Sequence, residues 1–258
     1  MFDIKNTNEP ILTLMLRSNT PDDLIKEIKS GLKSGAEGFC LSMQEMAKEY
    51  RTAEQIKSVI DAMGGKVCYI TNYRRSDLNT EVQSDEESAK EMLTAISCGA
   101  DIIDVMGDMF LPSPDEITYD EVAVEKQKEY IAKIHEMGAT ALMSSHVLKY
   151  LPPDEVLKIA KAQASRGVDI VKIVVMSDTE EQLYSNFEIN AMLTREIEQP
   201  VLFLSGGEFR QKHRIFGPFL SKPNLFLVGN NDEQDQIQPI IKDAIDARKL
   251  AKREAKKQ

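Results

Sequence analysis

The sequence predicts an α/β protein that folds as a single (β/α)8 TIM barrel spanning residues 1–258. Short apolar runs alternate with amphipathic stretches along the whole chain, which is typical of βα units around a parallel sheet. Eight such pairs follow one another, and eight strands close a barrel of this type. Glycine ends five of the helical stretches just before the next strand, as helix C-termini prefer.

Each expected element follows from its own stretch of sequence. Strands are expected at the apolar runs 11–16, 37–42, 66–71, 101–106, 139–144, 169–174, 200–205 and 224–229. Helices are expected at 21–35, 51–65, 84–99, 119–138, 152–167 and 179–197, with a short helix at 209–217 and a C-terminal helix at about 232–257. Thr20 before Pro21, and Ser84 before Asp85, are helix-capping signals that favour these boundaries.

A doubly wound open sheet is the alternative architecture. It is less favoured because no glycine-rich dinucleotide fingerprint follows the first expected strand. The length would also accommodate two smaller domains. No linker or shift in composition divides the chain, so one domain is expected.

The net charge and the cysteine content limit which partners and which cellular compartment are expected. A net charge of -10 argues against a nucleic acid or an anionic membrane as partner, because phosphate binding requires a basic face. Cys40, Cys68 and Cys98 form no CxxC pair, which fits a reducing compartment. The N-terminus lacks a signal-peptide pattern and no apolar run reaches the length of a membrane span, so a cytoplasmic protein is expected. No metal or other cofactor is expected, since no two His or Cys residues fall at ligand spacing on one element.

Two side chains capable of catalysis occur on neighbouring expected strands. Lys172 interrupts the run DIVKIVV, and a strand of that composition is buried on both faces. Desolvation disfavours an ammonium, so Lys172 is expected to be a neutral amine that can form a Schiff base with a ketone or aldehyde. His146 on the preceding strand could then transfer the protons. The alternative is that Lys172 reaches the barrel rim or pairs with an acid.

The strand ends supply candidates for binding a substrate, because active sites of such barrels lie at the C-terminal ends of the strands. A group of cationic side chains around one opening of an acidic protein predicts a small anionic substrate, a carboxylate or a phosphate. The candidates at these positions are Arg17, Ser42, Arg74, Ser144, His213 and Arg214.

Two segments resemble a known family. The segment 142–176 holds SSHVL and then VDIVKIVVM, and these are similar to the S-x-H strand end and the D-[IV]-x-K strand of the type I 3-dehydroquinate dehydratases of the shikimate pathway, a route of aromatic amino acid biosynthesis. PVLFLSGGEFRQKHRIFG, at 200–217, is similar to the strand, Gly-containing loop and Arg-Ile pair of that family. The resemblance implies a lyase that dehydrates a cyclic keto acid through an imine on Lys172. It also implies that His146 transfers the protons and that Arg214 binds the substrate carboxylate. Family members are often dimers, so a homodimer is one state to consider by analogy.

The sequence departs from the family pattern at several positions. Cys40 and Ser42 replace the E-x-R that usually ends the second strand, Met106 replaces a His-orienting Glu, Val147 replaces the Asp that commonly follows the His, and Arg74 lies one position later than the usual third-strand Arg. Asp104 is then the nearest acid, and Arg17 could supply a replacement cation. Two other functions therefore stay open. One is a Schiff-base lyase or aldolase for a different small anionic keto substrate, and the other is a non-catalytic metabolite-binding barrel.

Overall fold

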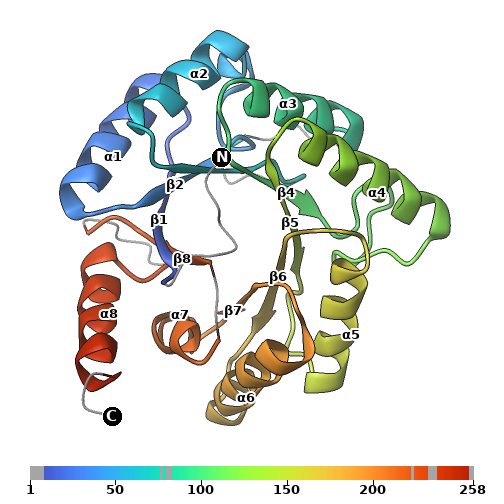
Figure 1. Ribbon diagram of the computed structural model, residues 1–258, viewed down its shortest axis with the longest axis vertical. Coiled ribbons are helices and arrows are strands. Elements are labelled where there is room, and N and C mark those ends of the chain that lie inside the picture. The colour runs from blue at the N-terminus through green and yellow to red at the C-terminus, as the bar shows by residue number, and fades with distance from the viewer. Residues whose placement is uncertain (1–8, 76–77, 80–82, 222–223, 232–236, 256–258) are drawn as a thin grey trace.

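Eight parallel strands form one sheet in the order β7-β6-β5-β4-β3-β2-β1-β8. The structure is a computed structural model that describes residues 9–75, 78–79, 83–221, 224–231 and 237–255. The strands are β1 (Ile11–Met15), β2 (Gly38–Ser42), β3 (Val67–Thr71), β4 (Ile102–Met106), β5 (Thr140–His146), β6 (Ile170–Met176), β7 (Val201–Gly206) and β8 (Leu225–Val228). The sheet curves into a nearly closed barrel with β7 and β8 at its two ends, which confirms the predicted (β/α)8 barrel (Figure 1).

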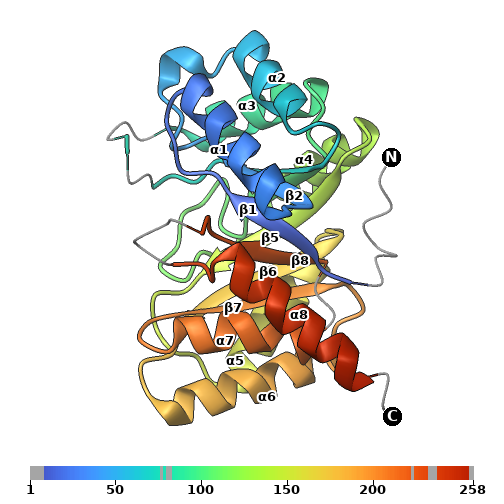
Figure 2. The same cartoon turned by 90° about the vertical axis from the view of Figure 1, so that its left-hand side faces the viewer.

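The helices form a ring outside the sheet (Figure 1). They are α1 (Pro21–Ser34), α2 (Ala53–Ala62), α3 (Asp85–Ser97), α4 (Glu121–Glu136), α5 (Pro153–Ala164), α6 (Glu180–Glu196), α7 (Arg210–Phe216) and α8 (Ile241–Ala255), with 3-10 turns η2 (Lys48–Tyr50) and η3 (Gly217–Phe219). Figure 2 shows α8 running back toward the end of the barrel at which β1 begins. Helices α1 to α7 each connect one strand to the next, as parallel pairing requires.

The structure differs from the predicted C-terminal helix at its start. The helix was expected from about residue 232, whereas α8 begins at Ile241, and residues 232–236 and 256–257 lie outside the described residues. Residues 237–240 are not helical because the chain there pairs with the end of β8. The Gly229 N–H donates to the Pro239 carbonyl over 2.9 Å, and the Ile241 N–H donates to the Gly229 carbonyl over 3.0 Å.

Two apolar layers hold the barrel together. One fills the barrel interior and includes Ile11, Tyr69, Leu142 and Leu225. The other lies between the sheet and the ring of helices. Successive side chains of a strand point to opposite faces, so alternate residues of each strand belong to different layers. This alternation decides which side chains reach the interior and can meet there.

The helix signals in the sequence act as expected. The Thr20 hydroxyl accepts a hydrogen bond from the Asp23 N–H over 3.3 Å, and Ser84 forms a capping box with Glu87. Gly35 ends α1 in the left-handed conformation with φ of 97°, which costs glycine little.

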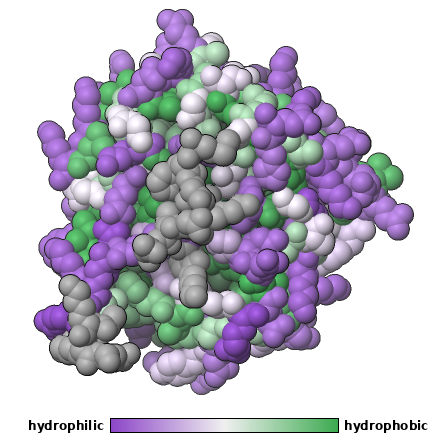
Figure 3. Space-filling model, viewed as in Figure 1, coloured by the Kyte–Doolittle hydropathy of each residue, from purple (hydrophilic) through white to green (hydrophobic). Residues whose placement is uncertain are grey.

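Hydrophilic side chains dominate the rim of the face in Figure 3. None of the helices in the described part of the chain has the length and apolarity to span a membrane.

Candidate active site

Lys172 projects into the barrel interior from the middle of β6. Its side chain is 4% exposed and lies among apolar residues of the inner layer, which include its neighbours Ile170 and Val174 on alternate positions. On the next strand Ser144 is paired with Lys172, and His146 is paired with Val174. His146 therefore lies one inward-facing position closer to the C-terminal end of the barrel than Lys172.

Three side chains surround the Lys172 amine. Its Nζ lies 3.1 Å from Oδ2 of Asp104 on β4, 3.0 Å from the Tyr69 hydroxyl and 2.6 Å from the Tyr73 hydroxyl. Both tyrosine hydroxyls also donate to Asp104, Tyr73 over 2.6 Å, and the Ser144 hydroxyl donates to the other Asp104 oxygen over 2.6 Å. The pairing with an acid, one alternative considered from the sequence, is thus present, and the carboxylate of Asp104 is fully engaged.

The two tyrosines remain protonated in this cluster. Burial is the main cause that raises the pKa of both Tyr69 and Tyr73 well above the usual phenol value, and the negative charge of Asp104 adds to it. Neutral phenols can both donate and accept a hydrogen bond. Here each accepts from the Lys172 ammonium while donating to Asp104, which links the three groups into one proton-bearing network.

His146 is oriented by a carboxylate that the sequence did not suggest. Oε2 of Glu116 lies 2.8 Å from Nδ1 of His146 and accepts the His146 backbone N–H over 2.9 Å. Burial alone would raise the pKa of Glu116, but the hydrogen bond and charge of His146, with the charge of Arg75, lower it to about 2. Glu116 is therefore an anion that holds the Nδ1 proton and leaves Nε2 of His146 free to act as a base. Burial, as the largest cause, keeps the pKa of His146 below its usual value.

Tyr73 connects the two halves of the site. Its hydroxyl contacts the Lys172 amine, and its ring packs edge-on against the His146 ring, with ring centroids 4.9 Å apart and an angle of 74° between the planes. Tyr73 thus links Lys172 and His146 inside the barrel. Tyr73 is half-buried, whereas Tyr69 is fully buried beneath it.

The loop that carries Glu116 is held in place by several contacts. Glu116 adopts a left-handed conformation with φ of 47°, which is uncommon for a residue with a side chain. Its carbonyl accepts the Ser145 hydroxyl over 2.7 Å. The buried guanidinium of Arg166 donates to the Gly107 carbonyl over 2.6 Å and to the Thr118 carbonyl, which fixes both ends of the loop. The left-handed backbone conformation of Glu116 is strained, and such strain persists only where surrounding contacts hold the residue in place.

A buried arginine, Arg214, lies on α7, the helix that follows β7. Arg214 of α7 donates to the Ser205 carbonyl over 2.7 Å and to Oε1 of Gln238 over 2.6 Å. Within the described residues these two partners are uncharged oxygens. Burial, followed by the charges of Arg210 and Arg17, lowers the pKa of Arg214 to about 10, so it stays cationic at neutral pH. Three guanidinium groups near one another favour binding of an anion.

Two of the expected substrate-binding residues lie in other surroundings. Arg74 is directed to Asp85 and Asp108, with Nη1 2.9 Å from an Asp108 oxygen and Nε 2.8 Å from an Asp85 oxygen, so two carboxylates already neutralise its charge. His213 lies behind β7, stacked on the Phe187 ring at 5.3 Å between ring centroids. Its Nε2 lies 2.8 Å from the Asn190 amide, and burial lowers its pKa to about 4. These placements differ from the expectation that both residues face an anion at the barrel mouth.

The remaining departures from the family pattern lie on β2, at the end of β4 and just after β5. Cys40 is buried in the inner layer, and burial raises the pKa of its thiol to about 12, which leaves it an inert thiol. Ser42 ends β2 and is paired with Thr71. Met106 ends β4 and is buried, and Val147 packs in the outer layer. The second strand therefore presents small uncharged groups to the site.

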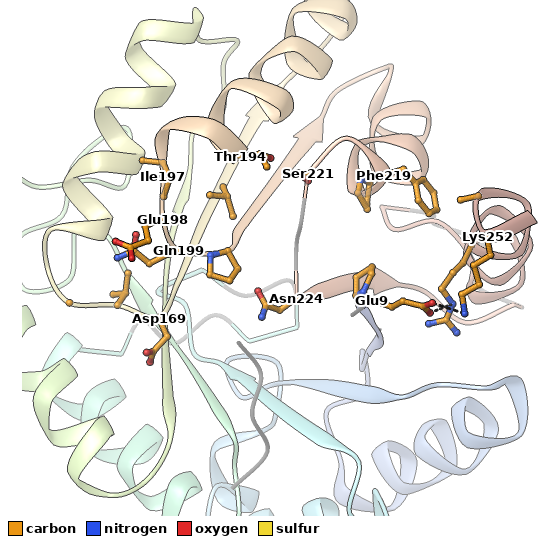
Figure 4. A pocket seen from close by; sticks show the side chains of 18 of the residues that line it. Glu9, Asp169, Thr194, Ile197, Glu198, Gln199, Phe219, Ser221, Asn224 and Lys252 are labelled. Atoms are coloured by element: carbon orange, nitrogen blue, oxygen red, sulfur yellow. Dashed lines mark ion pairs between the residues drawn. The ribbon is translucent and has the colours of Figure 1, made fainter. Parts of the chain in front are cut away.

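A separate hollow of about 1380 Å³ lies at the other end of the barrel, where the strands begin (Figure 4). Its lining includes Glu9, which pairs with Lys252 over 2.7 Å, and Asp169, which pairs with His135 over 2.8 Å. Because these charged side chains already pair with each other, their charges are not available to a ligand. This hollow is distinct from the Lys172 site, since barrel chemistry belongs to the C-terminal ends of the strands.

Four site residues were absent from the sequence-based candidates: Tyr69, Tyr73, Glu116 and Gln238. Tyr69 could have been found, because it lies two residues after Val67 on the same expected strand and shares its inward face. Tyr73 follows the end of β3, where Arg74 was the candidate instead. Glu116 and Gln238 lie in loops whose sequences carry no local signal for their positions.

Comparisons with known proteins point to one family. A family model described as Type I 3-dehydroquinase matches residues 13–252. A relative, the 3-dehydroquinate dehydratase of Lactiplantibacillus plantarum, is 26% identical over 176 residues, a match that covers 66% of this chain and 65% of the relative.

Solved structures share the fold at low sequence identity. One is a type I 3-dehydroquinate dehydratase from Clostridium difficile with covalently modified comenic acid, with a TM-score of 0.81, 16% identity, and coverage of 96% of this chain and 94% of that chain. Another is a 3-dehydroquinate dehydratase from Geobacillus kaustophilus HTA426, with a TM-score of 0.80, 12% identity, and coverage of 98% and 99%.

Proposed function

Because the chain belongs to the type I 3-dehydroquinase family, we propose that it is a lyase that eliminates water from a cyclic keto acid through a Schiff base on Lys172. His146 serves as the general acid and base. 3-Dehydroquinate is the first substrate to test, since the family model and the relative both carry its name.

The observation that supports this proposal is the pairing of a buried amine with a carboxylate-oriented imidazole. Lys172 offers a nucleophile that is 4% exposed, and His146 stands beside it with Nδ1 held by Glu116 over 2.8 Å. A Schiff base needs the first group, and removal of a proton next to the imine carbon needs the second. The non-catalytic alternative is weakened because Glu116 supplies an orienting acid for His146, whose usual family position is occupied by Met106.

The proposed reaction has three stages. The Lys172 amine attacks the ketone and loses water to give an iminium, which acts as an electron sink. His146 then removes a proton from the adjacent carbon and forms an enamine. The enamine expels the hydroxyl at the next carbon as water, with the proton returned by His146, and hydrolysis of the conjugated imine releases an enone and the free amine.

Recognition of the substrate is assigned to the arginines at the barrel mouth. Arg214 binds the carboxylate, because it is a buried cation held by uncharged partners in the described part of the chain. Arg17 adds a second positive charge to the same region. Replacing Arg214 by Gln is expected to raise KM on the order of 10-fold or more, since charge-assisted contacts contribute about 1.5–3 kcal/mol.

Borohydride trapping tests the covalent step. Wild-type protein incubated with 3-dehydroquinate and borohydride should gain a stable mass adduct that peptide mapping assigns to Lys172, and Lys172→Met should gain none. Lys149→Met is the matched control, because Lys149 is an exposed lysine paired with Asp115 at the surface. An adduct that forms equally well in Lys172→Met would refute the proposal.

A Schiff-base lyase or aldolase of different specificity is the second candidate. It is favoured by Cys40 and Ser42, which give the second strand no charged group with which to bind substrate hydroxyls. Absorbance separates the two functions, because a conjugated enone appears only if water is eliminated. Trapping of a simpler keto acid without enone formation from 3-dehydroquinate would favour the second candidate.

A further inference from the structure

The hydroxyl of Tyr73 occupies the space next to the atom that would attack the substrate. It lies 2.6 Å from the Lys172 Nζ, closer than either Asp104 at 3.1 Å or Tyr69 at 3.0 Å. It also donates to Asp104 over 2.6 Å, so a proton on the amine has a two-bond path to the carboxylate through this phenol. A group in this position is within reach of any carbonyl oxygen bonded to the carbon that Lys172 attacks.

We propose that Tyr73 is a catalytic residue that transfers protons between Lys172, Asp104 and the substrate carbonyl oxygen while the imine forms and while it is hydrolysed. The inference rests on the proposed function, since it assigns a further residue to the same covalent step. Nothing in the family pattern seen in the sequence suggested a tyrosine at this place.

The first transfer frees the amine. The Lys172 ammonium gives one proton to Tyr73 as Tyr73 gives its own proton to Asp104, which leaves a neutral amine, a neutral phenol and a protonated carboxyl. The nitrogen lone pair then forms the C–N bond, and the π electrons of the carbonyl move to its oxygen. That oxygen takes a proton from Tyr73, which recovers one from the nitrogen, and a neutral carbinolamine results.

The second transfer removes water. The carbinolamine C–O bond breaks as its oxygen takes a second proton from Tyr73, and the nitrogen lone pair forms the C=N bond. Asp104 returns its proton to Tyr73. The products are an iminium on Lys172, the Asp104 carboxylate as its counter-ion, a neutral Tyr73 and one water, so charge and protons balance. Hydrolysis follows the same path in reverse.

Tyr69 provides a matched comparison within the same cluster. Its hydroxyl also contacts Lys172 and Asp104, but it lies fully buried in the inner apolar layer. Tyr73 is half-buried and packs against His146 at the mouth, where a substrate would enter. Replacing Tyr by Phe at each of the two positions therefore distinguishes a hydroxyl that faces the substrate from one that only holds the Lys172 amine in place.

The test is the rate of Lys172 adduct formation with excess 3-dehydroquinate, quenched with borohydride at timed intervals. Tyr73→Phe should slow trapping on the order of 100-fold, as expected for loss of a positioned proton-transfer group, and Tyr69→Phe should slow it only a few-fold. A fluorinated tyrosine at position 73 keeps the ring shape but makes the phenol a stronger acid. It should change the trapping rate, whereas a purely structural role would leave that rate unaltered.

The outcomes distinguish this inference from the proposed function. If wild-type protein forms no adduct with any keto acid tested, the proposed function fails. If wild-type protein forms the adduct and Tyr73→Phe forms it at the same rate, only the assignment of Tyr73 is overturned. Equal slowing in Tyr69→Phe and Tyr73→Phe also overturns it, because both hydroxyls would then act by holding Lys172. The fluorinated variant decides the matter if Tyr73→Phe does not fold.

Discussion

Replacing Glu116 by Gln tests whether this loop residue controls the basicity of His146. The substitution keeps the size of the side chain and removes the negative charge that lies 2.8 Å from Nδ1 of His146. It also removes the charge that pairs with Arg75. The backbone hydrogen bond from the His146 N–H can still be accepted by the amide oxygen, so the protein is expected to fold.

The size of the effect follows from the lost interaction. A hydrogen bond to a charged group contributes about 1.5–3 kcal/mol, and each 1.36 kcal/mol on the barrier changes the rate about 10-fold. A fall in kcat of about 10- to 100-fold is therefore expected. Glu116 favours the protonated form of His146 and opposes the effect of burial, so its removal lowers the pKa of His146 further. Because the proposed base is the neutral form of His146, the acid limb of the pH profile should move to lower pH.

Stability against acid gives an independent measure of the same pair. The pKa of Glu116 falls from 4.5 to about 2 on folding, so its stabilising contribution is present above pH 4.5 and is lost as the pH falls toward 2. The wild-type protein should lose about 3 kcal/mol of unfolding free energy over this window that Glu116→Gln does not lose. Urea unfolding at pH 5, 4, 3 and 2 measures it.

Glu121→Gln changes an exposed glutamate at the start of α4 and should leave the kcat and the pH profile as in wild type. If Glu116→Gln retains wild-type kcat and an unshifted acid limb, the carboxylate does not set the basicity of His146, and the assignment of Glu116 as its orienting residue would be refuted.

Three further predictions concern the residues around the site. Gly107→Ala would bring a Cβ to 2.6 Å from the Glu116 carbonyl, so it should cost about 1–3 kcal/mol of stability, seen in urea unfolding, and should lower kcat as Glu116 moves. Asp104→Asn should destabilise by about 3–5 kcal/mol because the Lys172 charge loses its carboxylate, and adding Lys172→Met should restore part of that loss. The pKa of His213 is lowered from 6.5 to about 4, so wild-type stability should fall by about 3 kcal/mol from pH 6.5 to pH 4, and His213→Leu should abolish that dependence.

The barrel could be predicted from the sequence because its repeated unit leaves local signals. Apolar runs mark strands that are buried on both faces, and capping residues such as Thr20 and Ser84 act at the positions where the sequence places them. The predicted family is confirmed by the match over residues 13–252. The start of α8 was missed because the pairing of Gly229 with Ile240 joins residues distant in sequence, and no periodicity records such a contact.

The sequence predicted site residues only where a reactive side chain lies within a strand or at its end. Lys172 and His146 could be singled out because each is a reactive residue inside or at the end of an apolar run. Arg74 was placed at the barrel mouth because it follows β3, but Asp85 and Asp108 attract it from α3 and from the next loop. Those carboxylates are 11 and 34 residues away in sequence, so only the folded chain shows that they neutralise Arg74. Only the folded chain likewise shows that Tyr73, and not Arg74, contacts the Lys172 amine.

Met106 replaces the Glu that orients the catalytic His in the family, but this replacement does not by itself lower the basicity of His146. That basicity depends on the geometry of the groups around the imidazole. A carboxylate has to accept the Nδ1 proton from within hydrogen-bond reach, and any backbone segment that passes this point can supply it. Here the loop between β4 and α4 does so, and it can because Gly107 allows the Glu116 carbonyl to approach and Arg166 binds the loop at both ends. Glu116 and His146 therefore form a hydrogen-bonded pair that depends on Gly107 and Arg166. Substitutions at these two supporting positions are expected to change the His146 pH profile before they change substrate affinity.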